Sequence, residues 1–240
     1  MNALVAEFIG TTILLLLGNG VVANVVLKDT KGNDSGLVVI ALAWGLAVFV
    51  GVFITADFSG AHLNPAVSIG LAAAGSFTWS SVPGYIAAQF GGAMLGTTLV
   101  WLMYRPHYES TEDPGAILAS FANTPAIKDT LSNFLSEFLG TFVLVYAVLH
   151  IVGATVGDQE ASLGSLDALP VALVVVVIGM SLGGTTGYAI NPARDLGPRI
   201  MHTILPISHK GSSAWWYAWL PVIAPIAGGV AAGLLKVVIG

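Results

Sequence analysis

Cysteine and charge are what this sequence has least of. None of its 240 residues is a cysteine, which excludes a disulfide framework and any metal site built on thiolates. Only 9% of the residues are charged, whereas an average soluble domain has about 25%. So few charges cannot cover a water-exposed surface. This scarcity argues against a soluble enzyme, a nucleic-acid-binding protein or a disordered regulator.

Apolar residues, in contrast, make up 55% of the chain, and its mean hydropathy is +0.85. A membrane-spanning helix uses about 20 apolar residues. Runs such as Leu169 to Ile178 are apolar at odd and even positions alike, which favours helices over the alternating strands of a membrane barrel. The stretches without Asp, Glu, Lys or Arg cover residues 8–27, 36–56, 58–104, 138–157, 168–193 and 211–235. We therefore expect an all-α membrane protein with six transmembrane helices.

The chain contains an internal repeat. Residues 6–11 resemble residues 136–141, residues 59–66 resemble residues 186–193, and the glycine pair at 91–92 recurs at 228–229. Three matches in the same order indicate a duplicated half. Because each half holds an odd number of spans, the second half must cross the membrane in the opposite sense, as in other inverted repeats.

This repeat gives the expected domain organisation. We expect a first repeat over 1–104, a connecting loop over 105–131 and a second repeat over 132–240. The polar, proline-containing connecting loop favours a surface linker over a loop folded into the mouth of a pore. The expected spans cover about 3–27, 36–56, 83–104, 132–155, 168–185 and 215–239, and two half-helices cover 65–75 and 192–202.

Two Asn-Pro-Ala triplets are the central motif of the sequence. Asparagine caps a helix N-terminus through its side-chain oxygen, and proline favours the first helical position, so each triplet begins a helix. The first of these helices has room for about ten residues, or about 15 Å, half the hydrocarbon thickness. Two such half-helices entering from opposite faces would meet near the midplane. The motif residues are Asn64, Pro65, Ala66, Asn191, Pro192 and Ala193.

The predicted meeting point of the half-helices is positive and rich in hydrogen-bond donors. Each helix N-terminus carries about half a positive charge, which opposes cations and proton relay. The amide groups of Asn64 and Asn191 would donate to a neutral solute. The non-helical backbone before each triplet is tolerable at this depth only where it lines a wet cavity. The predicted pore-lining carbonyls belong to Gly60, Ala61, His62, Leu63, Gly187, Tyr188, Ala189 and Ile190.

Four charged residues fall at or near membrane depth. Glu7 and Glu137 occupy equivalent places in the two repeats, where an unpaired carboxylate is costly, and we favour bracing of the buried loops over a proton relay. Arg194 is expected to face the pore. Neighbouring side chains on a helix diverge by about 100°, which disfavours an Arg194–Asp195 salt bridge, so we expect Asp195 to brace structure elsewhere.

No enzymatic constellation is present in the sequence. The five histidines lack metal-ligand spacing, and there is neither a Ser-His-Asp arrangement nor a P-loop. We therefore expect no enzyme activity, no cofactor and no metal. A solute-gating role for His62 or His150 is a minor alternative.

With these motifs, the chain resembles the major intrinsic protein family of aquaporins and glycerol facilitators over essentially its whole length. The resemblance rests on both triplets, the paired Glu-Phe-x-Gly-Thr openings and the Asn-Pro-Ala-Arg continuation. It implies a right-handed aquaporin-like bundle, a homotetramer with one pore per subunit, and a multi-pass protein of the cell membrane with both termini cytoplasmic. The distribution of Lys and Arg favours the reverse orientation; we follow the family.

The resemblance also implies a selectivity filter formed by Trp44, Gly179, Tyr188 and Arg194. Water-selective members typically have Phe and His where this chain has Trp44 and Gly179, which implies a wider opening with an aromatic wall. Asp195 and Pro221 resemble the glycerol branch. Departures from that branch are Tyr188 in place of the commoner Phe, Val222 in place of Leu, and the additional carboxylate Asp57.

We therefore expect a passive channel for glycerol and other small uncharged solutes, together with water, that excludes ions and protons. Trp44 and Tyr188 would contact the carbon backbone of a polyol while Arg194 bonds its hydroxyls. The alternatives are a water-selective channel, a facilitator of protonated lactic acid or hydrogen peroxide, a structural membrane assembly with a vestigial pore, and an ion channel. The expected partners are small neutral solutes, the lipid bilayer and further copies of the chain, with no nucleic acid.

Overall fold

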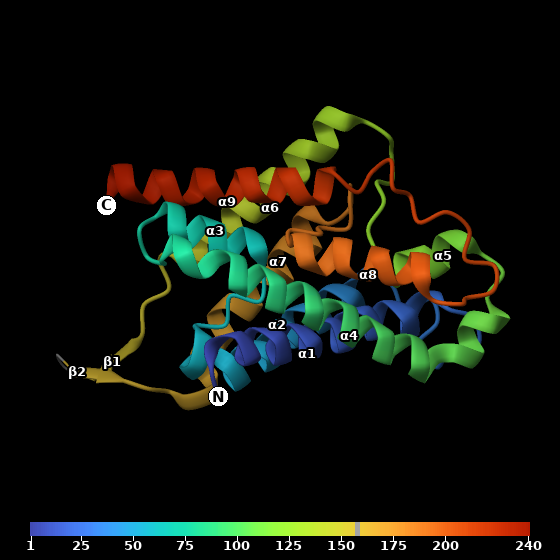
Figure 1. The fold of residues 1–240 in the computed structure, drawn as a ribbon, viewed down its shortest axis with the longest axis horizontal. Coiled ribbons are helices and arrows are strands. Elements are labelled where there is room, and N and C mark those ends of the chain that lie inside the picture. Colours follow the sequence, from blue (N-terminus) through green and yellow to red (C-terminus); the bar gives the residue numbers. More distant parts are fainter. Residues whose placement is uncertain (157–158) are drawn as a thin grey trace.

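The computed structural model describes residues 1–156 and 159–240. Within these residues, six helices are long and apolar enough to cross a membrane. They are α1 (Ala3–Val26), α2 (Leu37–Ser59), α4 (Val82–Ser110) with the 3-10 turn before it, α6 (Thr130–Val148), α7 (Leu169–Leu182) with the 3-10 turn before it, and α9 (Leu220–Ile239). The 14 residues of α7 reach the length of a span only together with Gly164–Ala168. The predicted helical membrane fold is confirmed. Both chain termini lie at the same end of the bundle (Figure 1), as an even number of spans requires.

Shorter elements complete the chain. Two half-length helices, α3 (Pro65–Ala73) and α8 (Pro192–Ile204), lie roughly end to end between α9 on one side and α1 and α4 on the other (Figure 1). The remaining elements are α5 (Pro114–Ala119), the 3-10 turns η1 (Trp79–Ser81) and η2 (Gly164–Ala168), and the strands β1 (Ala154–Val156) and β2 (Gln159–Ala161). The strands pair antiparallel with Ala154 opposite Ala161, and this pairing was not predicted from the sequence.

Glycines set how closely the helices approach. A methyl group at Gly92 on α4 would overlap the carbonyl oxygen of Phe8 on α1, and one at Gly228 on α9 would overlap that of Phe138 on α6. The two halves therefore use equivalent close contacts. On another face of α9, a Cβ at Gly229 would lie 2.6 Å from the carbonyl oxygen of Ala66, and one at Gly233 would overlap that of Gly70. These glycines let α9 hold the half-helix α3 against the bundle.

Several element boundaries differ from the expected ones. The helix α6 ends at Val148 rather than near 155, and its last turn closes through bonds from the N–H groups of Leu149 and His150. The helix α9 begins at Leu220 rather than 215 because residues 214–220 form tight turns, with Tyr217 N–H bonded to Ala214 O and Leu220 N–H to Tyr217 O. The helix α4 continues to Ser110 through Pro106, whose missing N–H removes one bond without ending the helix here.

Other ends differ less. The helix α7 ends at Leu182, α3 ends at Ala73 and α8 extends to Ile204.

At the start of α6, Asp129 caps the helix by accepting from Ser132 N–H at 2.7 Å, and this bond lowers the pKa of the exposed Asp129 carboxyl. Such capping is a local property of the sequence.

The segment 105–131 is not the plain surface linker that its composition favoured. Its second part contains α5 and buries Ile117, Phe121 and Ala122 completely. The backbone N–H of Ala126 donates to Thr185 O at 2.9 Å, which attaches the segment to the loop before the second triplet. Its apolar residues pack with Leu205, Ile207 and Ala214, so burial of these side chains outweighs the polar character of the segment as a whole.

Candidate functional site

The two half-helices begin at the asparagines of the triplets. Asn64 and Asn191 both have extended backbone, with φ of −159° and −155°. The Asn64 side-chain oxygen accepts from Ala66 N–H at 2.9 Å, and that of Asn191 accepts from Ala193 N–H at 3.0 Å and Arg194 N–H at 3.1 Å. Each asparagine oxygen is therefore used to cap its own helix.

The amide nitrogens of these asparagines join the two halves of the molecule. Asn64 Nδ2 donates to the Ile190 carbonyl at 2.8 Å, and Asn191 Nδ2 donates to the Leu63 carbonyl at 2.9 Å. Each amide has two N–H groups, so one remains for a solute, whereas both were predicted to be available. The Leu63 and Ile190 carbonyls were expected to line the pore. Each accepts one of these two hydrogen bonds, which occupies one of the two lone pairs of its oxygen.

The loops before the triplets have unusual backbone geometry. Ala61, Leu63, Tyr188 and Ile190 all have positive φ, between 43° and 50°. The left-handed conformation costs a residue with a side chain about 1–2 kcal/mol. The positive φ angles fall at the same places in both loops, one and three residues before the asparagine of each triplet. Such a conformation persists only where its surroundings hold it.

Glu7 holds the first of these loops. Its carboxylate is completely buried and accepts from the backbone N–H groups of His62 at 2.8 Å and Leu63 at 2.7 Å. It also accepts from Ser59 Oγ and Gln89 Nε2, each at 2.7 Å. Four bonds, two of them to backbone, fix the path of the chain just before Asn64.

Glu137 holds the second loop in the equivalent way. It accepts from the backbone N–H groups of Ala189 at 2.9 Å and Ile190 at 2.8 Å, and from Thr186 Oγ1 at 2.6 Å. Gln89, which was not predicted to belong to the site, also donates to Ser68 Oγ on α3 at 3.1 Å. Its signal was an uncharged amide alone in the middle of an apolar span.

Asp195 and Arg199 form a second buried group that the sequence only partly revealed. Both are completely buried, and Arg199 Nη2 lies 2.7 Å from Asp195 Oδ1. Arg199 further donates to the carbonyls of Asn123 at 2.7 Å and Ser213 at 2.7 Å, and Asp195 accepts from Asn123 N–H at 2.7 Å. Arg199 is thus not a surface charge. The spacing of four between Asp195 and Arg199 was the available signal.

A cavity of about 260 Å³ runs between the two halves. The residues from Gly60 to Asn64 and from Tyr188 to Asn191 are part of its lining. The sequence-predicted residues Gly179 and Gly187 lie outside this lining; a Cβ at Gly187 would lie 2.9 Å from Asn123 Nδ2. Much of the remaining wall is apolar. It includes Leu14, Val48, Val52, Val67, Leu71, Leu144, Val148, Val171 and Val175.

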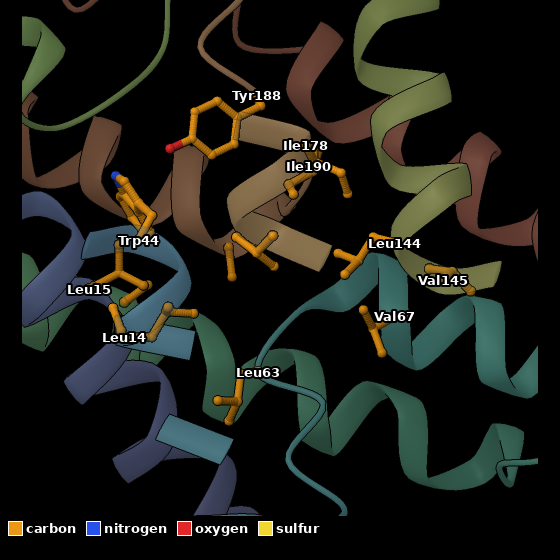
Figure 2. Close-up of a cluster of buried hydrophobic side chains, with 14 of the residues drawn as sticks. Leu14, Leu15, Trp44, Leu63, Val67, Leu144, Val145, Ile178, Tyr188 and Ile190 are labelled. Carbon is orange, nitrogen blue, oxygen red and sulfur yellow. The ribbon is translucent and has the colours of Figure 1, made fainter. Parts of the chain in front are cut away.

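Trp44, Tyr188 and Arg194 come together at one part of this cavity, and Figure 2 shows the first two on the same side of the buried cluster. The Arg194 guanidinium lies 4.4 Å from the centre of the Trp44 ring, within cation–π range. Among the described residues Arg194 makes no ion pair, because Asp195 is turned toward Arg199. The Trp44 ring lies against Gly18, where a methyl group would overlap it.

The Tyr188 ring lies beside Gly179. A Cβ at Gly179 would lie 2.8 Å from Tyr188 Cζ and 3.0 Å from its hydroxyl oxygen. The space that the missing side chain leaves is therefore filled by the Tyr188 ring. The absence of a side chain at Gly179 makes room for the aromatic ring of Tyr188.

The remaining sequence candidates differ in their contacts and exposure. His62 lines the cavity, with Nδ1 at 3.0 Å from Ser68 Oγ and its ring centre 4.5 Å from that of Phe77. His150 is exposed and bonds through Nδ1 to Tyr146 O at 2.8 Å. Asp57 is exposed and Val222 is half-buried. Over residues 1–156 and 159–240, no group of His, Asp and Glu is suited to hold a metal ion.

Comparison with known proteins shows the family to which this chain belongs. Residues 1–236 match the family model of the major intrinsic proteins. The chain belongs to the major intrinsic protein family. The family inferred from the motifs is confirmed, and as a member of this family the chain is a multi-pass membrane channel rather than an enzyme.

The relatives of this major intrinsic protein cover nearly all of it. The "Glycerol uptake facilitator protein" of Streptococcus pneumoniae strain R6 is 58% identical over 235 residues, which is 98% of both chains. The "Probable glycerol uptake facilitator protein" of Thermotoga maritima is 52% identical over 96% of both chains. Among solved structures, the aquaglyceroporin from Plasmodium falciparum matches with a TM-score of 0.85 and 32% identity, over 99% of this chain and 95% of that one.

Proposed function

We propose that this chain is a passive channel that conducts glycerol and other small uncharged solutes, together with water, and excludes ions and protons. The observation that carries the proposal is the amphipathic constriction, in which the rings of Trp44 and Tyr188 share a narrow cavity with the guanidinium of Arg194. The names of the relatives, glycerol uptake facilitators at 50–58% identity, support the same solute.

The cavity offers a polyol contacts for both parts of its structure. Arg194 and the remaining N–H groups of Asn64 and Asn191 donate to hydroxyl oxygens, and the backbone carbonyls of the two loops accept from hydroxyl protons. The aromatic rings and the aliphatic wall contact the carbon backbone. A solute that exchanges water for these groups passes without losing all its hydrogen bonds.

The same geometry opposes ions. The N-termini of α3 and α8 both begin at the cavity, so their positive ends and the charge of Arg194 act together against cations. An anion meets an aromatic and aliphatic wall that cannot replace its hydration. The asparagine amides donate to the oxygen of a passing water, which opposes a continuous proton relay past this point.

We further propose a homotetramer in the cell membrane, with one pore per subunit and both termini cytoplasmic. The family resemblance supports this assembly, and the position of both termini at one end of the bundle (Figure 1) supports a common side for them. Because the chain has no cysteine, single cysteines placed in loops on either side and labelled by an impermeant reagent test the orientation. Chemical cross-linking in liposomes tests the tetramer.

Stopped-flow light scattering of proteoliposomes tests the channel. We expect glycerol flux well above that of empty vesicles, and a loss of most of it in Arg194→Ala, because the substitution removes the charged donors from the constriction. Arg105→Ala is the matched control, since Arg105 is exposed and, among the described residues, contacts Glu109 and the ring of Trp101 outside the cavity lining. Water flux without glycerol flux would contradict the proposal in favour of a water channel. Faster flux of protonated lactic acid or hydrogen peroxide than of glycerol would identify a different main solute.

A further inference from the structure

The lining of the cavity includes a stripe of residues on α7 and on the turn η2 before it. The stripe consists of Asp167, Val171 and Val175, whose spacing of four places them on one side of the helix. Along this stripe the side chains become less exposed, from the exposed Asp167 through the half-buried Val171 to Val175, which is 5% exposed. The stripe therefore leads from the protein surface into the interior.

The helix α6, which contacts α7, shows the same gradient in the opposite chain direction. Its lining residues are Leu144, which is 5% exposed, and the half-buried Val148, followed by Ile151, which is 38% exposed. The strands β1 and β2 lie between Ile151 and Asp167 in the chain, at the end of the bundle that holds both termini (Figure 1). The cavity thus opens at this end, and Ile151 and Asp167 form part of its mouth.

The mouth carries a negative charge without a counter-ion. Asp167 is the one carboxylate among the described residues that line the cavity, and neither ion pair in residues 1–156 and 159–240 includes it. Its carboxylate accepts from Ser162 Oγ at 3.0 Å and from Leu163 N–H at 3.2 Å. A carboxylate has about four acceptor positions, so these two bonds leave it able to accept from a bound cation.

Behind the mouth, the wall of the cavity is aliphatic. The half-helix α3 runs from Asn64 toward the end that holds the termini (Figure 1) and adds Val67 and Leu71 to the valines of α6 and α7. The cavity has about 260 Å³, whereas an apolar cavity of about 150 Å³ is enough to bind benzene. A short hydrocarbon chain therefore has room along this wall.

We propose that this end of the cavity binds small amphipathic monocations of the alkylammonium class and that a bound ion blocks conduction. The ammonium group lies at Asp167, in the water-exposed mouth, and the alkyl chain lies along the aliphatic wall. The proposal rests on the proposed function for its readout, because a blocker is detected by the loss of glycerol flux.

The charges of the cavity allow only one orientation of such a ligand. The opposite part of the lining holds the guanidinium of Arg194, and the positive N-termini of α3 and α8 begin at Asn64 and Asn191. An ammonium group placed there would be repelled, so the alkyl chain enters first and the cation remains at the mouth. An alkyl carboxylate in the same orientation would bring its charge next to Asp167, and an alcohol would gain only the burial of its chain.

Inhibition of glycerol flux in proteoliposomes tests the site, with n-hexylammonium chloride at equal concentration on both sides. The half-inhibitory concentration is measured against the uninhibited flux of the same protein. We expect Asp167→Asn to raise it by about three- to tenfold, because the substitution removes the attraction between two unit charges in contact but keeps an acceptor oxygen for the loop. Inhibition by n-hexanol, which has no charge, should be the same in both proteins.

Asp57→Asn is the matched control. Asp57 is also an exposed carboxylate, on the helix α2 that contacts η2, but it lies outside the cavity lining. This variant should keep the parental half-inhibitory concentration of n-hexylammonium. Because both variants are measured in vesicles of one composition, partition of the amine into the bilayer cancels from the comparison.

Four outcomes would overturn the proposal. They are an unchanged half-inhibitory concentration of n-hexylammonium in Asp167→Asn, an equal rise in Asp57→Asn, an equal rise for n-hexanol in Asp167→Asn, and a parent that hexanoate blocks as strongly as n-hexylammonium. Failure of the proposed function is distinct, since it is read without any blocker as glycerol flux no faster than through empty vesicles. In that case the same comparisons are made on water flux.

Discussion

At the scale of single residues, the buried glutamates show how a charge can be kept inside a membrane protein. Glu7 and Glu137 are completely buried, yet each accepts two backbone N–H groups of the left-handed loops. The carboxylate oxygens accept the hydrogen bonds that the buried loop N–H groups must make, and these N–H groups replace the water that a charged carboxylate would otherwise need. Each therefore acts on the solute only through the shape of the backbone.

Glu7→Gln should weaken this arrangement. An amide keeps one acceptor oxygen, but its NH₂ group would face donors such as Leu63 N–H and Gln89 Nε2. We expect the free energy of unfolding to fall by about 1.5–3 kcal/mol, which is typical of a hydrogen bond to a charged group. We also expect a lower glycerol permeability. Thermal unfolding in detergent and proteoliposome flux measure the two effects.

The matched control is Glu109→Gln. Glu109 is exposed and, among the described residues, forms its ion pair with Arg105, and such surface pairs contribute about 0–1 kcal/mol. The control should leave both readouts at the parental value. An equally stable and equally permeable Glu7→Gln protein would contradict the bracing role.

At the scale of secondary-structure elements, the half-helix α3 depends on how closely α9 approaches it. Its nine residues are too few for an isolated helix to be stable in water. Besides the Asn64 cap, it is held by the glycine face of α9, where the backbones of the two helices meet at Gly70 and Gly233. The half-helix α8 also packs closely on a full span, since a Cβ at Gly197 would lie 3.0 Å from that of Ala93 on α4.

Gly233→Ala tests the contact of α9 with α3 against Gly20→Ala. A methyl group at Gly233 would overlap the Gly70 carbonyl, whereas one at Gly20 would have its nearest neighbour, Val100 Cγ2, at 3.9 Å. We expect Gly233→Ala to destabilise the protein by about 1–3 kcal/mol through overpacking. Gly20→Ala should be neutral or stabilising, because alanine is the better helix former. Equal thermal stability of the two variants would show that α9 can move away from α3 without cost.

At the scale of the whole molecule, the buried pair of Asp195 and Arg199 connects distant parts of the chain. Arg199 on α8 bonds to Asn123 of the connecting segment and to Ser213 and Ala214 before α9. Three segments that the sequence separates are thus held at one buried guanidinium. Removal of one member of such a pair leaves an uncompensated charge.

We expect Arg199→Met to destabilise the protein by about 3–5 kcal/mol. The double variant Asp195→Asn with Arg199→Met should recover part of this loss, because it no longer buries an isolated carboxylate. A double-mutant cycle of thermal stabilities measures the coupling. Strictly additive losses would contradict a direct interaction between the two side chains.

The sequence predicts the parts of this molecule that obey local rules. The spans follow from charge-free stretches, the starts of α3 and α8 from Asn-Pro at a helix N-terminus, and the importance of Glu7 and Glu137 from the cost of a charge at membrane depth. The burial of Arg199 was not predicted from the sequence, because it depends on where residues 117–123 fold. The contact of Tyr188 with Gly179 was not predicted, because a glycine does not reveal which distant side chain fills the space beside it.

The crossed bonds of the two asparagines also constrain how the protein is made. The partner of the Asn64 amide is a carbonyl 126 residues further along the chain, and that of the Asn191 amide is 128 residues back. When the first half leaves the ribosome, its re-entrant loop still lacks this bond. The loop can reach its final form only after α4, α6 and α7 have been inserted. Closure of the conduction path is therefore one of the last events in biogenesis, and an incomplete chain does not enclose a finished pore.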